Sequence, residues 1–163
     1  MDYVYVGKIV DTHGIKGELR IRSNFEKKEL VFKPNMVFYI GDTYIPETVN
    51  TYRPHKEFDM VTFSSYNNIN EVLKYLKQKV YVKRSDLELN NNDYLLQDLI
   101  GLDVVEEKTI LGKVSEIMYN NGNDLLCITG KNNFYIPLKG NFIKKVNVNE
   151  GIIEVENTKG LII

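Results

Sequence analysis

Apolar and polar residues alternate along much of the first half of the chain, and this alternation predicts strands. After Gly17, Leu19 and Ile21 fall on one side of an extended backbone, while Arg20 and Arg22 fall on the other. Further short runs that read as strands cover residues 36–40, 44–49, 58–63 and 81–84. We therefore expect half-buried strands that pack one face on a core.

The period changes between residues 68 and 80, and the new period predicts a helix. Apolar residues recur there at spacings of three and four, as on one face of an amphipathic helix. These residues are Ile69, Val72, Leu73, Leu76 and Val80. Asn68 is a suitable N-cap, and Glu71 follows three residues later in the capping-box position.

An Asn-rich polar segment, residues 87–92, separates this unit from a second series of strands and is interpreted as a linker. The second series consists of six short apolar runs: LDVVEE, KVSEIMY, DLLCITG, FYIPL, FIKKVNV and IIEVE. Many short strands joined by turns are typical of small barrels or sandwiches. The pattern therefore predicts a mainly β protein with two domains, residues 1–86 and residues 93–163.

Charge is distributed unevenly between the two halves. The 163-residue chain has a net charge of −1, which by itself predicts no affinity for nucleic acid. Residues 1–86 contain 14 Lys or Arg against 11 Asp or Glu, whereas residues 87–163 contain 7 against 11. This asymmetry indicates that the two domains face different partners.

Several classes of protein are disfavoured by what the sequence lacks. Cys127 is the single cysteine, so no intramolecular disulfide is possible, and its apolar neighbours predict a buried thiol. No CxxC or Cys/His spacing indicates a metal site, and no motif indicates a cofactor. The N-terminus lacks the features of a signal peptide and no apolar run reaches membrane-spanning length, so we expect a cytoplasmic protein without a membrane partner.

The residues around Gly14 and Gly17 form the first candidate site. Lys16, Arg20 and Arg22 would make a compact cationic patch, and the arginine forks suit phosphate groups. An ordinary solvated strand face explains the same pattern, so both interpretations stay open. His13 is either an RNA contact or base, or a residue that stabilises the adjoining loop.

A second histidine, His55, lies in the charged segment RPHKEFD beside Arg53. This segment reads as a hairpin loop, and the aromatic neighbours Tyr52 and Phe58 could add it to an RNA-binding surface. A small hydrolase using His13 or His55 is a further hypothesis. No GxSxG motif, reactive cysteine or metal-spaced acid pair accompanies the histidines, which disfavours it.

The start of the second domain carries the third candidate. Tyr94, Leu95 and Leu96 form a dense apolar cluster that is either a protein interface or an edge of the core. Asn123 and Asp124 lie at a predicted turn, where Asx-turn chemistry explains them better than cation binding does.

These motifs, in this order, resemble the RimM family of bacterial ribosome maturation factors, the 16S rRNA processing proteins. The resemblance spans nearly the whole chain, through VGKIVDTHGIKGELRIRS, RPHKEFDMVTF, NINEVLKYLKQKVYVKRSDL, DYLLQDLIGLDVV and LGKVSEIMYNNGNDLLCI. It implies a six-stranded N-terminal barrel like those of translation factors and a C-terminal PRC-type barrel. The family commonly has two tyrosines and a tryptophan where this chain has Tyr94, Leu95 and Leu96.

The resemblance also implies a function and its residues. It implies a non-catalytic, monomeric assembly factor that binds the immature small ribosomal subunit and assists maturation of its head and 16S rRNA processing. The implied contacts with rRNA or the ribosome are His13, Lys16, Arg20, Arg22 and Arg53. The implied contacts with the nineteenth protein of that subunit are Tyr94, Leu95, Asp98, Asn123 and Asp124. A general RNA-binding β-barrel protein is the alternative.

Overall fold

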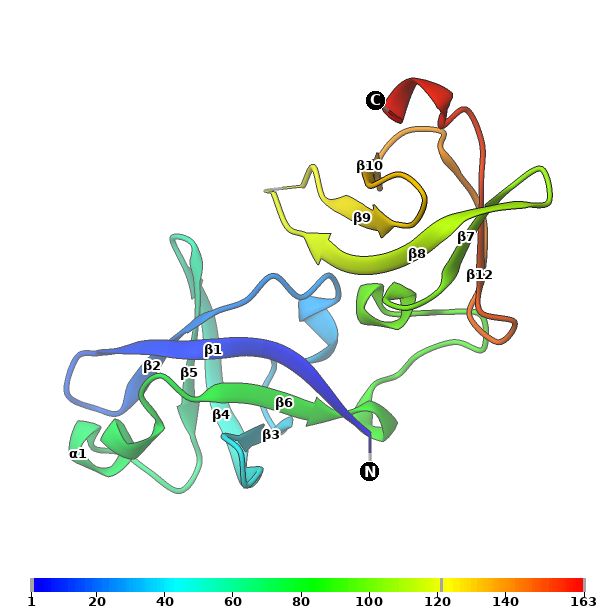
Figure 1. Cartoon of the computed structure of the whole chain (residues 1–163). Coiled ribbons are helices and arrows are strands. Elements are labelled where there is room, and N and C mark those ends of the chain that lie inside the picture. Colours follow the sequence, from blue (N-terminus) through cyan, green and yellow to red (C-terminus); the bar gives the residue numbers. More distant parts are fainter. Residues whose placement is uncertain (1, 121, 163) are drawn as a thin grey trace. The chain divides into compact units, whose positions relative to one another are not determined.

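The computed structural model describes residues 2–120 and 122–162, and the chain forms two compact units (Figure 1). The first unit ends at Leu89 and the second begins at Asn90. Most described residues that have regular structure lie in strands, which confirms the mainly β fold.

The first unit is a closed barrel whose strands, within the described residues, follow the order β1-β2-β5-β4-β3-β6. The strands are β1 (Tyr3–His13), β2 (Glu18–Arg22), β3 (Val37–Ile40), β4 (Ile45–His55), β5 (Phe58–Phe63) and β6 (Lys79–Lys83). Every neighbouring pair is antiparallel. Closure pairs β1 with β6 as well as with β2, so the barrel has no free sheet edge.

The barrel core confirms the alternation seen in the sequence. Leu19 and Ile21 of β2 are fully buried, as are Phe38 of β3 and Val80 of β6. Burial of such side chains contributes about 1.5–3 kcal/mol each. Because Leu19 and Ile21 face inward, Arg20 and Arg22 face outward.

The predicted helix over residues 68–80 is wrong in length. The α-helix α1 spans Ile69–Val72 and continues only as the 3-10 helix η2, Leu73–Tyr75. Lys77 has a φ of 66°, and the chain then enters β6, where Val80 pairs with Gly7 and Ile40. Val80 is thus buried as a strand residue, although its spacing also suits a helix.

The N-cap of α1 is confirmed, with a small shift in the capping box. The Asn68 side chain accepts a hydrogen bond from the Asn70 amide at 2.8 Å. The Glu71 carboxylate accepts from the Asn67 amide at 3.4 Å, one residue earlier than the usual capping box. The cap fixes the helix start next to the β1–β2 turn, because the Ile69 amide donates to the Ile15 carbonyl at 3.0 Å.

The second unit contains one six-stranded sheet with the order β10-β9-β8-β7-β12-β11 in the described residues. The strands are β7 (Asp103–Glu106), β8 (Thr109–Met118), β9 (Leu125–Thr129), β10 (Phe134–Pro137), β11 (Ile143–Asn147) and β12 (Ile152–Val155). β12 runs parallel to β7, and the other neighbours are antiparallel. Each strand corresponds to one of the six predicted apolar runs.

The core of the second unit comes from the inner positions of these strands and from one short helix. The 3-10 helix η4 (Leu96–Leu99) contributes Leu99, which is fully buried. It packs with Val104, Val114, Leu126, Ile128, Phe134, Ile136, Ile153 and Val155. The other 3-10 helices are η1 (Lys28–Leu30), η3 (Arg84–Asp86) and η5 (Lys159–Leu161). In residues 2–120 and 122–162, no helix has the length and apolar character needed to cross a membrane.

Candidate functional site

Arg20 and Arg22 project side by side from β2 onto one aromatic ring of β5. Their guanidinium carbons lie 5.7 and 5.5 Å from the centroid of the Phe58 ring. This distance is within the range of a cation–π interaction, which orients the guanidinium groups while the ring supplies an apolar floor. We call Arg20, Arg22 and Phe58 the arginine surface. Arg22 is exposed and Arg20 is half-buried.

Arg20 is held in place by two residues of β1. Its Nη2 lies 2.9 Å from Nδ1 of His13, and its Nη1 lies 3.9 Å from the Asp11 carboxylate. Arg20 can only donate, so His13 accepts at Nδ1 and carries its ring proton on Nε2. The His13 side chain therefore positions Arg20, in keeping with a stabilising hydrogen bond rather than with a free general base.

His13 and His55 lie close together, with ring centroids 5.6 Å apart. Desolvation lowers the pKa of His55, and the positive charges of Arg53 and Lys56 lower it further. A neutral His55 adds no further positive charge to the basic groups around it. Within the part of the chain that the structure describes, no group of three or more His, Cys, Asp or Glu side chains is placed to hold a metal ion.

Arg53 is paired with Glu18 through two hydrogen bonds. Arg53 Nε donates to Glu18 Oε2 at 2.9 Å, and Nη2 donates to Oε1 at 2.8 Å. These bonds lower the pKa of Glu18, which keeps the carboxylate charged. The fork–fork geometry fixes the Arg53 guanidinium but balances its charge, so Arg53 adds less positive potential than Arg20 and Arg22 do.

Lys16 lies at the exposed tip of the β1–β2 turn, next to Ile15, whose side chain is 77% exposed. The structure therefore gathers His13, Arg20, Arg53 and His55 at one end of the barrel, with Lys16 on the adjoining turn. The pairing of Glu18 with Arg53 and the shared Phe58 ring were not predicted. Both depend on strand register, and the sequence offered only the nearness of Phe58 to the charged segment.

The second set of candidate residues lies in the second unit. Tyr94 is half-buried, whereas Leu95 is fully buried. The Asp98 carboxylate accepts a hydrogen bond from the Leu95 amide at 2.8 Å, which fixes the turn into η4. The implied contact of the Leu95 side chain with a partner does not fit this structure, because that side chain is buried in the core.

Asn123 and Asp124 lie between β8 and β9. Asp124 Oδ1 accepts from the Asn120 amide at 2.9 Å, and the Asp124 carbonyl accepts from the Leu138 amide at 3.0 Å. Asp124 therefore stabilises the chain around the turn, but its side chain bonds to an amide four residues earlier and not, as in the predicted Asx-turn, to one two residues later. Asn123 is exposed and available to a partner.

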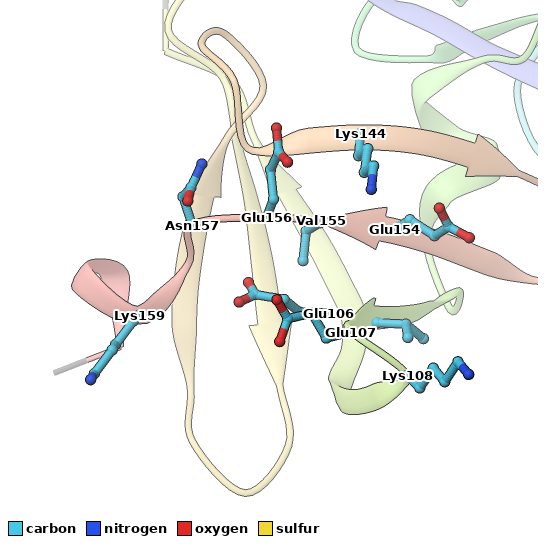
Figure 2. A pocket seen from close by; sticks show the side chains of 10 residues that line it. Glu106, Glu107, Lys108, Lys144, Glu154, Val155, Glu156, Asn157 and Lys159 are labelled. Atoms are coloured by element: carbon cyan, nitrogen blue, oxygen red, sulfur yellow. The ribbon is translucent and has the colours of Figure 1, made fainter.

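A hollow of about 530 Å³ opens elsewhere on the second unit, along β7 and β12 (Figure 2). Its lining includes the carboxylates of Glu106, Glu107, Glu154 and Glu156, together with Lys108, Lys144 and Lys159. Thr158 Oγ1 donates to Glu106 at 2.6 Å, so one carboxylate is fixed. Carboxylates outnumber lysines in this lining, in agreement with the acidic balance of residues 87–163.

The fold and these surfaces define a two-domain β protein with a basic, aromatic surface on its N-terminal barrel and an acidic second domain. A model of the RimM N-terminal domain matches residues 4–87, and a model of the RimM PRC barrel domain matches residues 96–161. The chain therefore belongs to the RimM family of ribosome maturation factors. Family membership confirms the resemblance seen in the motifs and the PRC-barrel class of the second unit, and it makes the protein a non-catalytic factor.

Curated relatives match the chain along nearly its whole length. The chain is 38% identical over 165 residues to the ribosome maturation factor RimM of Bacillus subtilis, covering 96% of this chain and 95% of the relative. It is 34% identical over 164 residues to that of Staphylococcus haemolyticus, covering 98% of each chain. A solved structure described as a 16S ribosomal RNA processing protein RimM from Pseudomonas aeruginosa covers 94% of this chain and 96% of its own, with 19% identity and a TM-score of 0.44.

Proposed function

We propose that this protein binds the immature small ribosomal subunit and assists maturation of the subunit head and 16S rRNA processing. The observation that carries the proposal is the arginine surface on the N-terminal barrel of a RimM-family protein. Arginine forks above an aromatic ring suit a phosphate backbone with bases nearby. The protein acts in the cytoplasm as a monomer and forms no covalent intermediate.

The mechanism follows from differential binding. A factor without an active site can favour one rRNA conformation only by binding it more tightly than the alternatives. The protein binds the assembly intermediate, stabilises the arrangement that leads to the mature head, and dissociates when the mature state no longer fits. Its contribution is therefore a difference between two affinities.

The second domain supplies the contact with a protein partner. Tyr94, Asp98, Asn123 and Asp124 face the nineteenth protein of the small subunit in this proposal. Residues 87–163 carry four more acidic than basic residues, and carboxylates outnumber lysines in the lining of the hollow along β7 and β12. This charge supports a basic partner, because opposite potentials favour encounter and orientation.

The role of the arginine surface is tested with the double variant Arg20→Ala/Arg22→Ala. We expect its affinity for immature small subunits to fall and the slope of log affinity against log salt to decrease by about 2, because each lost phosphate contact removes about one unit. Co-sedimentation across a salt series measures both. The matched control, Lys131→Ala/Lys139→Ala, removes the same charge from the second unit. Equal effects of the two double variants would argue against the arginine surface.

A general RNA-binding role is the second candidate, favoured by the pairing of cations with an aromatic ring on one surface. It predicts that naked RNA binds with the same affinity as the assembly intermediate, and that Arg20→Ala/Arg22→Ala abolishes both interactions. If binding needs the ribosomal protein and hardly changes in the double variant, this candidate fails.

A further inference from the structure

Five tyrosines gather on the outer wall of the first barrel, over β1, β6, β3 and the turn after β3. They are Tyr3, Tyr5, Tyr39, Tyr44 and Tyr81, here called the tyrosine surface. Val4 and Val6 of β1 are buried, so the intervening Tyr5 faces outward, and Tyr81 lies outward between the buried Val80 and Val82. Strand register places Tyr81 opposite both Tyr5 and Tyr39.

The rings form one continuous cluster. Tyr3 and Tyr44 stack with centroids 4.0 Å apart and planes 4° apart, and Tyr3 also lies 5.3 Å from Tyr39. Tyr81 meets Tyr44 at 5.1 Å and Tyr5 at 5.8 Å, edge to face in both cases. Tyr5 is 41% exposed. Packing of the rings against one another fixes their orientations, so little side-chain entropy is lost when a flat ligand stacks on them.

Three lysines of β1 and β6 lie beside the tyrosine surface. Lys79 and Lys83 share the outer face of β6 with Tyr81, on either side of it, and Lys8 of β1 is the register partner of Lys79. The Lys83 ammonium lies 5.1 Å from the centroid of the Tyr39 ring. Asp42 interacts electrostatically with Tyr81, and Asp86 with Lys83, so the surface is only moderately positive.

The tyrosine surface is separate from the arginine surface. Around the closed barrel, β4 separates β3 from β5, and β1 separates β6 from β2. Tyr3 and Tyr5 lie in the first part of β1, which pairs with β6, whereas β1 pairs with β2 only from Lys8 onward. A ligand on the outer wall of β6 and β3 therefore approaches a different side of the barrel from one that lies over Arg20, Arg22 and Phe58.

We propose that the tyrosine surface is a stacking platform for a single-stranded segment of RNA. Aromatic side chains on the face of a sheet bind unpaired bases through their rings, and neighbouring lysines bind the phosphates. Lys79 and Lys83 lie four residues and about 13 Å apart along β6, with Tyr81 between them at about 6.6 Å from each. This alternation of charge, ring and charge matches a nucleic-acid strand better than it matches an apolar protein surface. The inference adds a second RNA contact to the proposed function and is tested without ribosomes.

The test is fluorescence anisotropy of a labelled oligouridine of about eight nucleotides, a length within the usual range for stacking sites, with the full chain. The variant Tyr5→Leu/Tyr81→Leu keeps apolar area but removes two rings, and we expect at least a tenfold loss of affinity. The matched variant Tyr5→Phe/Tyr81→Phe keeps the rings and should bind within about twofold of the wild type. The salt slope should be about −2, as expected for up to three phosphate contacts on a single strand.

Tyrosine fluorescence and a charge-reversal variant test the rings and the lysines separately. The chain contains 11 Tyr and no Trp, so the difference in oligonucleotide quenching of tyrosine fluorescence between the wild type and Tyr5→Leu/Tyr81→Leu reports stacking on these rings. Lys79→Glu/Lys83→Glu leaves the tyrosines in place and should weaken binding at low salt more than at high salt. Equal binding by the Leu and Phe variants, or no binding by the wild-type chain, would overturn the inference. So would capture of a basic ribosomal protein through these tyrosines in place of RNA. Because no subunit is present, failure here leaves the binding of immature subunits to be judged by co-sedimentation.

Discussion

Counter-charges determine how much positive potential individual residues offer at the arginine surface. Glu18 balances Arg53 through two short hydrogen bonds, whereas the Asp11 carboxylate lies 3.9 Å from Arg20 and is largely exposed. Exposed ion pairs at such distances contribute little. At this scale, Arg20 and Arg22 are the residues whose charge remains available to a phosphate backbone.

His55 gives the barrel a pH dependence with a definite sign. Its pKa in the folded protein lies below the ordinary value of 6.5, first through desolvation and then through nearby cations. The unfolded chain therefore binds a proton more readily. The stability associated with a neutral His55 is fully present above about pH 6.5 and is lost as the pH falls through the folded pKa.

We predict that His55→Gln reduces the loss of unfolding free energy between about pH 7.5 and pH 5, the range in which histidine titrates. Urea unfolding of both proteins at several pH values measures this difference. If the two profiles run parallel across that range, His55 does not carry the effect.

Which residue details follow from the sequence depends on how local they are. The outward placement of Arg20 and Arg22 follows from alternation alone, and burial of Cys127 follows from its apolar neighbours. The burial of Leu95 does not follow, because Tyr94 and Leu96 beside it remain half-buried while Leu95 enters the core. The tyrosine surface was also missed. Its signal in the sequence was alternation: Tyr3 and Tyr5 alternate with the apolar Val4 and Val6, and Tyr81 stands between Val80 and Val82.

At the scale of elements, a buried hydrogen bond ties the short helical segment to the barrel wall. The Tyr75 hydroxyl at the end of η2 donates to the carboxylate of Glu47 on β4, and both residues are buried. Desolvation, followed by the bond to Glu47, raises the pKa of Tyr75, so the phenol stays protonated. A buried carboxylate without such a donor is costly.

We predict that Tyr75→Phe lowers the free energy of unfolding by about 1.5–3 kcal/mol, the usual range for a hydrogen bond to a charged group. Tyr66→Phe is the matched control, because the Tyr66 hydroxyl lies 3.5 Å from that of Tyr75 at a partly exposed site. Denaturant unfolding should show a clearly smaller loss for Tyr66→Phe. Equal losses would mean that the Tyr75–Glu47 bond does not stabilise the barrel.

The backbones of β8 and β9 approach each other so closely at Gly112 that this position requires glycine. A Cβ at Gly112 would lie 2.5 Å from the Thr129 carbonyl oxygen of β9, which is too close for any side chain. Gly160, by contrast, has nothing within 4 Å of such a Cβ. The β8–β9 pair can approach in this way only because position 112 lacks a side chain.

Accordingly, Gly112→Ala should destabilise the protein by about 1–3 kcal/mol through overpacking, while Gly160→Ala should be nearly neutral. Thermal unfolding followed by circular dichroism compares the two variants. A Gly112→Ala protein as stable as the wild type would contradict the close contact between β8 and β9.

Strands were predictable where the apolar residues followed the strand period alone. They were not predictable where the same apolar residues suited both helical and strand spacing. The six strands of the second unit each coincide with an apolar run. The apolar residues from Ile69 to Val80 suit helical spacing. Val80 nevertheless lies in a strand, because β6 pairs there with β1 and β3. Tertiary strand pairing thus overrides local periodicity and shortens the helix to α1 and η2.

At the scale of the whole molecule, two domains of opposite charge balance present different surfaces. The family resemblance indicated two domains and an N-terminal barrel, and the family models confirm the two domains, but the strand order required the structure. In the proposal, the N-terminal barrel binds RNA and the second domain binds a ribosomal protein. Substitutions at the two surfaces, which share no contacts, should change the binding free energy additively.

The central claim is that the protein prefers an assembly intermediate to the finished subunit. Co-sedimentation of the full chain with purified immature and mature small subunits, at equal concentrations and one salt concentration, tests it most directly. The account predicts at least about tenfold tighter binding to immature subunits, equivalent to about 1.4 kcal/mol of differential affinity. Equal affinity for the two subunits would contradict it, since binding without a preference cannot drive maturation.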